Sequence, residues 1–170
     1  MTLRSPRRTN LPSLTLSVQC AVATRGLPVR STLRRWLLAA LERDASVTLR
    51  FVGEPEGRQL NTQFRGKGYA TNVLTFVYDE RSHDAPHDAP LAGDIVICVP
   101  VARREARAAG RPLRAHLAHL VVHGVLHLQG YDHERNRDAA RMERREADLL
   151  RRFRYSDPYA SNDDAMRARR

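Results

Sequence analysis

The sequence is poor in cysteine and contains no long apolar run. Cys20 and Cys98 are the only cysteines in 170 residues, and neither belongs to a Cys-x-x-Cys pair. Both lie in apolar, strand-like runs, which predicts two buried, reduced thiols of the kind that cytosolic proteins contain. No apolar stretch approaches the roughly 20 residues that a membrane-spanning helix needs. We therefore expect a cytoplasmic protein that does not associate with membranes.

Lysine is almost absent. Lys67 is the only lysine among 29 basic residues, which outnumber 19 acidic residues and give a net charge of +10. Because the planar guanidinium of arginine binds phosphate through two hydrogen bonds, this composition supports a polyanionic partner such as nucleic acid. Codon bias that replaces lysine by arginine on solvated faces explains the composition equally well. Charge alone leaves both interpretations open.

Length and composition are those of one ordinary globular domain. Hydrophobic residues make up 42% and charged residues 28% of the chain, as in soluble proteins generally. A chain of this length buries enough surface to fold without a metal, so a metal site here would be catalytic rather than structural.

Apolar periodicity and turn residues predict four strands and five helices. The strands are expected at residues 14–22, 46–52, 72–78 and 93–99, and the helices at 31–41, 54–64, 101–109, 112–129 and 137–154. Ser31 is expected to cap the first helix. The pattern predicts a single α+β (α/β-like) domain over residues 14–159, with a small mixed four-stranded sheet packed with about five helices. Residues 1–13 are interpreted as a disordered basic arm and residues 160–170 as a flexible tail.

Three histidines have the spacing of a metal site. His123 and His127 are four residues apart on the expected helix 112–129, so both imidazoles project from one face. Gly130 ends this helix and can adopt the left-handed conformation of a sharp reversal, which brings His133 back towards them. Three imidazoles leave a fourth tetrahedral position for water, the arrangement of a catalytic zinc site. We therefore expect one zinc ion per chain, on the long central helix and the turn that follows it.

The spacing His-x3-His-x2-Gly-x2-His is that of the metzincin proteases, but their general base is missing. Metzincins have a glutamate directly after the first histidine, and Gly124 stands at that position. The metal-bound water would lack its expected proton acceptor, so a peptidase is disfavoured. Asp132 is either an orienting partner of an imidazole or a turn residue.

Four further histidines are weighed as metal ligands. His116 is interpreted as a structural histidine, and the role of His119 on the same helix stays open. His83 and His87 are also four residues apart, but Pro86 argues against a helix that would align them.

The stretch HLVVHGVLHLQGYDH, residues 119–133, resembles the signature of the YbeY family of bacterial endoribonucleases. Other elements of the family occur in the same order. They are LNTQFR at 60–65, TNVLTF at 71–76, GDIVI at 93–97, the spacing of Met142 and Glu146, and the closing DPY at 157–159. The resemblance covers about residues 46–159.

This resemblance implies a zinc-dependent, single-strand-specific endoribonuclease that matures the 3′ end of 16S ribosomal RNA and acts in ribosome biogenesis. It implies His123, His127 and His133 as zinc ligands, a need for Arg65, and the small ribosomal subunit as a partner. Physical reasoning agrees on Arg65, because a guanidinium beside a metal can clamp a phosphate. Arg65 is otherwise a solvated turn residue.

The general base and two rival functions stay open. The base is a metal-bound hydroxide, Asp132, or none, and either water or the 2′-hydroxyl of the RNA attacks the phosphate. The rivals are a metal hydrolase for another substrate and a non-catalytic ribosome-assembly factor whose zinc organises an RNA-binding surface. The oligomeric state and the native metal cannot be read from the residues, since imidazole also binds nickel, cobalt and iron.

Overall fold

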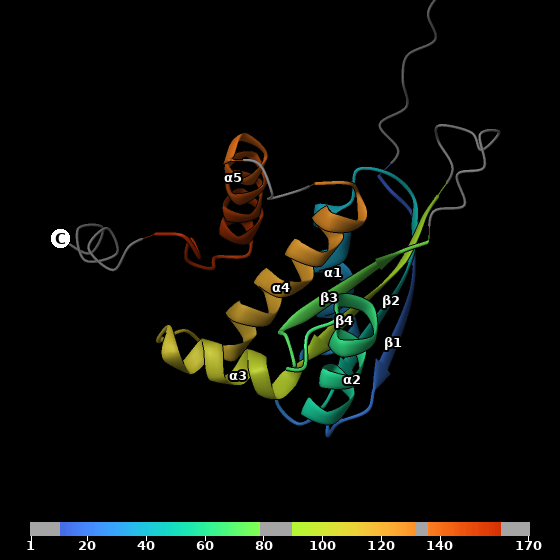
Figure 1. Cartoon of the computed structure of the whole chain (residues 1–170). Helices are drawn as coiled ribbons and strands as arrows, with labels where there is room; N and C mark the ends of the chain where they lie inside the picture. Colours follow the sequence, from blue (N-terminus) through green and yellow to red (C-terminus); the bar gives the residue numbers. More distant parts are fainter. Residues whose placement is uncertain (1–10, 79–89, 132–135, 161–170) are drawn as a thin grey trace, which may run out of the picture.

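The computed structural model describes residues 11–78, 90–131 and 136–160 (Figure 1). Most of the expected basic arm and flexible tail lie outside the described residues, and so do the loop 79–89, His83, His87, Asp132 and His133.

In the part of the chain that the structure describes, four strands form one mixed sheet in the order β1-β2-β4-β3. The neighbours β1 (Leu14–Cys20), β2 (Ala45–Val52) and β4 (Leu91–Cys98) are parallel, and β3 (Val73–Val77) pairs with β4 in the antiparallel direction. β3 therefore forms one edge of the sheet as described, with Thr75 opposite Ile95.

Five helices of the described residues accompany the sheet. They are α1 (Arg30–Ala40), α2 (Glu54–Arg65), α3 (Val99–Ala108), α4 (Leu113–Leu128) and α5 (Asn136–Arg152). The larger core lies between α1, α4 and one sheet face, and a smaller apolar cluster lies under α2 on the other face. In Figure 1, α5 stands beyond α4, on the side away from the sheet. The predicted α+β class, the mixed four-stranded sheet and the five helices are confirmed.

Helix α4 is buried because it lies between the sheet and α5. Its sequence is apolar on almost every side, which is typical of a central helix. Between Leu117 and Leu128, the only residues that are not buried are His119, His123 and His127. The packing of α4 therefore leaves one accessible stripe, and histidines occupy it.

Gly124 brings α4 close to strand β4. A Cβ atom built on Gly124 would lie 2.8 Å from Cγ2 and 3.0 Å from Cδ1 of Ile95, which is itself fully buried. Real Cβ atoms hardly ever come so close to a neighbour, and Ile95 has little freedom to move. A glutamate at this position would collide with the sheet, which explains why the metzincin base is absent from this fold.

Two local expectations are wrong. Cys20 is exposed, because it ends the edge strand β1; only Cys98 is buried, and burial raises the pKa of its thiol. Ser31 does not cap α1, because the helix begins one residue earlier, with Val29 at the capping position. No helix among the described residues is long and apolar enough to cross a membrane.

Candidate metal centre

His123 is held between a carboxylate and a second imidazole. Its Nδ1 lies 2.6 Å from Oε1 of Glu146, and its Nε2 lies 3.0 Å from Nε2 of His127. Because a carboxylate accepts hydrogen bonds, Nδ1 carries the proton and the lone pair of His123 is on Nε2. The two Nε2 atoms therefore face each other from consecutive turns of α4.

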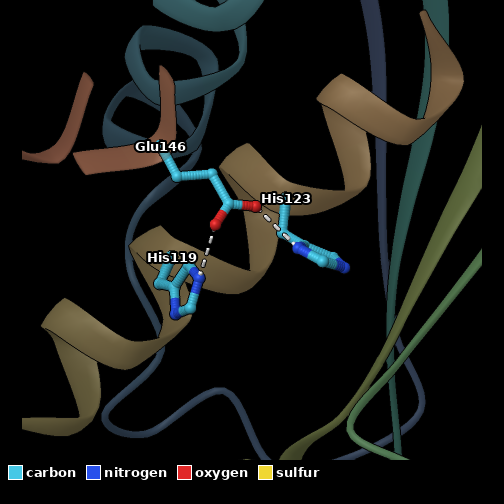
Figure 2. Close-up of side chains that lie close together, drawn as sticks. All are labelled: His119, His123 and Glu146. Carbon is cyan, nitrogen blue, oxygen red and sulfur yellow. Dashed lines mark hydrogen bonds and ion pairs between the residues drawn. The ribbon is translucent and has the colours of Figure 1, made fainter. Parts of the chain in front are cut away.

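Glu146 reaches this position from α5 and is completely buried. Figure 2 shows its carboxylate between the imidazoles of His119 and His123. Nε2 of His119 lies 3.1 Å from Oε2 of Glu146, and the hydroxyl of Tyr159 donates to the same oxygen. One carboxylate thus binds three side chains from two other segments of the chain.

The electrostatics of Glu146 favour its charged form. Burial alone would raise the pKa of this carboxyl group, but the hydrogen bonds from His119 and His123 outweigh burial and lower it to about 2. Burial and the hydrogen bond to Glu146 raise the pKa of Tyr159, which therefore stays a neutral donor. Glu146 is a carboxylate at every physiological pH.

These side chains allow two alternative metal sites, one that includes Glu146 as a ligand and one between His123 and His127. Ligand atoms of His119, His123 and Glu146 all lie within 4.8 Å of one another. However, two ligands of one zinc ion at about 2.0–2.1 Å in tetrahedral geometry are about 3.3 Å apart. The 2.6 Å contact of His123 with Glu146 is shorter and is a hydrogen bond, whereas the 3.0 Å between the Nε2 atoms of His123 and His127 is close to that separation. The geometry favours a metal between His123 and His127, with Glu146 behind them.

A pocket of about 330 Å³ opens in front of the two imidazoles. It is lined by Arg65, Thr71, Asn72, Val73, Thr75, Val77, His123 and His127. The structure therefore brings three of the four predicted site residues into one cavity, while His133 lies outside the described residues. The roles of all four stay predictions.

Two helix ends border the site, the end of α4 at Gly130 and the end of α2 at Arg65. Gly130 has φ +87°, its N–H donates to the carbonyl of His127, and the N–H of Tyr131 donates to that of Leu126. This is the left-handed helix end expected for Gly130. The hydroxyl of Tyr131 also donates to Glu42 at 2.7 Å, which ties the turn to the end of α1. Arg65 stands in the last turn of α2, just before Gly66 with φ +67°.

Comparison with known proteins supports the resemblance noted in the sequence. Residues 27–154 match the family model described as endoribonuclease YbeY. The chain belongs to the YbeY family. The predicted membership and enzyme class, endoribonuclease, are thereby confirmed at the level of the family.

Close relatives within the YbeY family are bacterial. The chain is 53% identical over 150 residues to endoribonuclease YbeY of Aromatoleum aromaticum, covering 86% of this chain and 93% of the relative. It is 54% identical over 150 residues to that of Thiobacillus denitrificans, covering 88% of this chain and 99% of the relative. For the Azoarcus sp. protein, 54% identity extends over 159 residues, 91% of this chain but 63% of the relative.

A solved structure shares the fold. The solution structure of TM1509 from Thermotoga maritima superimposes with a TM-score of 0.53 at 24% identity, covering 86% of this chain and 100% of that one. This similarity supports the architecture alone.

No role was predicted for Glu146 or Tyr159 from the sequence. A signal for Glu146 was present, because it occupies the apolar face of α5 together with Met142, Leu149 and Leu150, where an unpaired carboxylate would be costly. His119, left open, belongs to the Glu146 network. His116 contacts Glu105 at 2.8 Å outside the pocket, in agreement with a structural role.

Proposed function

We propose that this protein is a zinc-dependent, single-strand-specific endoribonuclease of the cytoplasm that matures the 3′ end of 16S ribosomal RNA. The observation that carries the proposal is the pocket in which the Nε2 atoms of His123 and His127 lie 3.0 Å apart beside Arg65. Its chain belongs to a family named for endoribonuclease activity. The substrate RNA would be presented on the small ribosomal subunit.

His123, His127 and His133 would hold one zinc ion per chain. When bound, zinc supplies a Lewis acid and lowers the pKa of a bound water. The donor set fits the ion, because Glu146 fixes the Nδ1 proton of His123 and leaves its Nε2 lone pair on the side of His127. Such carboxylate–histidine pairs orient metal ligands in many zinc enzymes. Glu146 is therefore a positioning residue.

Arg65 would bind the scissile phosphate. Arg65, in the last turn of α2, lines the same pocket as the imidazoles on α4, so a phosphodiester bound there would lie near both. Two parallel N–H donors match two phosphate oxygens and stabilise the charge that develops on them. The hydroxyls of Thr71 and Thr75 would offer further hydrogen bonds to the substrate.

The described residues that line the pocket include no carboxylate. Gly124 cannot be replaced by the metzincin glutamate, because that side chain would collide with Ile95. Asp132, which lies outside the described residues, is the remaining carboxylate candidate for the base. These facts weigh further against a peptidase of the metzincin type.

The test compares metal content and RNA cleavage of wild type, His127→Ala and His116→Ala. We expect about one zinc per chain in wild type and in His116→Ala, and cleavage of single-stranded RNA that a chelator abolishes. His127→Ala should lose both metal and cleavage. Metal retained by wild type without cleavage, at unchanged RNA affinity, would instead support a ribosome-assembly factor.

A further inference from the structure

One segment of the chain, residues 57–78, combines basic and aromatic side chains without any acidic residue. It runs from α2 through a loop into β3 and contributes six of the eight residues that line the pocket. Its cations are Arg58, Arg65 and Lys67, and its aromatic residues are Phe64, Tyr69, Phe76 and Tyr78. In a chain with 19 acidic residues, such a composition beside the pocket favours a polyanionic ligand.

Two of these aromatic side chains are exposed beside Arg65. Phe64 and Tyr69 are each 56% exposed. Of the seven large hydrophobic residues exposed in the described part of the chain, four lie in the segment 57–78. The ring of Phe64 meets that of Phe76 edge-on, with centroids 4.9 Å apart, which restrains its orientation.

The loop that carries Tyr69 is held in place by a buried asparagine. Asn61 is 1% exposed, and its Nδ2 donates to the backbone carbonyl of Tyr69 at 2.6 Å. The N–H of Lys67 donates to the carbonyl of Asn61, and the hydroxyl of Thr62 donates to the carbonyl of Lys67. The backbone is thus fixed while the side chain of Tyr69 points outwards. A ring on a fixed backbone loses little entropy when a ligand stacks on it.

We propose that Phe64 and Tyr69 form a stacking site for unpaired nucleobases around the end of α2, whose last residue, Arg65, lines the pocket, with Arg65 and Lys67 binding the adjoining phosphates. Every nucleobase has an exposed π-face when it is unpaired, whereas the bases of a duplex are stacked on each other. Such a site accepts single strands of varied sequence and rejects duplexes. The inference rests on the proposed function, since it places the substrate strand that leads into the same pocket.

The test separates stacking from phosphate binding. The affinity of the full-length protein is measured for a fluorescently labelled single-stranded deoxyoligonucleotide and for an abasic phosphodiester chain of the same length. Wild type should bind the oligonucleotide with bases more tightly. Phe64→Leu and Tyr69→Leu, which keep an apolar side chain of similar size, should each weaken that complex by about fivefold or more and leave the abasic complex unchanged.

Matched variants control for folding and for charge. Phe64→Tyr and Tyr69→Phe keep an aromatic ring and should bind like wild type. Val29→Ala changes an exposed apolar residue outside the segment and should have no effect. Lys67→Ala should weaken both complexes equally and flatten their salt dependence.

Equal affinity of wild type for the oligonucleotide and the abasic chain would overturn the stacking site, and so would leucine variants that bind like wild type. The exposed aromatic surface would then be assigned to a protein partner. Cleavage of RNA is assayed separately in the same preparations. Cleavage without base-dependent binding would sink the stacking site and keep the nuclease, and base-dependent binding without cleavage would do the reverse.

Discussion

Each half of α4 has a histidine that pairs with a carboxylate from a neighbouring helix, and the two pairs lie in different surroundings. In the N-terminal half, His116 lies 2.8 Å from Glu105, whose side chain is 39% exposed. In the C-terminal half, His123 lies 2.6 Å from Glu146, whose side chain is completely buried. The same chemistry thus occurs once at the protein surface and once in the core.

Their other partners explain what each pair does. Glu105 also accepts a hydrogen bond from Asn72, so it links α3 to the start of β3. Glu146 binds only groups of the site, namely His119, His123 and Tyr159, among the described residues. The two carboxylates thus differ in burial: water can replace the contact of His116 with Glu105, but it cannot replace the contact of His123 with Glu146.

The largest expected effect of the buried carboxylate Glu146 is a loss of unfolding free energy at acidic pH. The pKa of Glu146 is about 2 in the folded protein, below the roughly 4.3 of an unfolded glutamate. A lowered pKa contributes stability that is fully present above the unfolded value and is lost as the pH falls towards the folded value. Metal-free wild type should therefore lose about 3 kcal/mol of unfolding free energy between pH 5 and pH 2 through this group alone.

Denaturant unfolding at several pH values checks this expectation. Glu146→Gln cannot titrate, so its unfolding free energy should fall less steeply over the same acidic range, by about that amount. Identical slopes for wild type and Glu146→Gln would show that this carboxylate does not couple folding to pH.

The next prediction compares the two carboxylates directly. Glu146→Gln should weaken zinc binding by about 10- to 100-fold, because the neutral amide oxygen of glutamine is a weaker acceptor for the Nδ1 proton of His123 than the carboxylate that it replaces. Glu105→Gln, the matched change in the carboxylate that pairs with His116, should leave zinc affinity unchanged. Competition with a chromogenic chelator measures both. Equal losses of zinc affinity in the two variants would mean that any change in a carboxylate next to α4 affects the site, and that burial of the carboxylate is irrelevant.

The sequence predicted the local parts of the site, but it did not predict the contact between His123 and Glu146. His123, His127 and Gly130 lie within one helix and its end, and local spacing was enough to place the two imidazoles side by side and the left-handed turn after them. Glu146 is 23 residues from His123, and their contact depends on the packing of α5 against α4, which no local pattern encodes.

In the rest of the fold, too, local features were predicted from the sequence and non-local ones were not. Apolar periodicity indicated the strands and helices, because burial on one face is a local property. The order of strands is not local, so the exposure of Cys20 at the edge of the sheet was missed. Arg65 was singled out through a resemblance, and its entry into the pocket depends on how α2 lies against β3.

The smallest expected effect tests whether the position of α4 on the sheet sets the geometry of the C-terminal half. Gly124→Ala places a methyl group about where the side chain of Ile95 lies, 2.8 Å from its Cγ2. Overpacking costs about 1–3 kcal/mol, and the better helix propensity of alanine returns about 1 kcal/mol at most. We expect a net loss of roughly 1–2 kcal/mol in unfolding free energy, measured by denaturant titration.

The matched control is Gly68→Ala, because a Cβ atom at Gly68 has no neighbour within 4 Å. It should change the unfolding free energy by less than about 0.5 kcal/mol. If α4 moves away from β4 to make room in Gly124→Ala, the imidazoles of His123 and His127 move relative to the pocket wall on β3, and zinc affinity should fall with stability. A variant that loses stability but binds zinc like wild type would show that the Glu146 network, and not the sheet, holds the ligands in place.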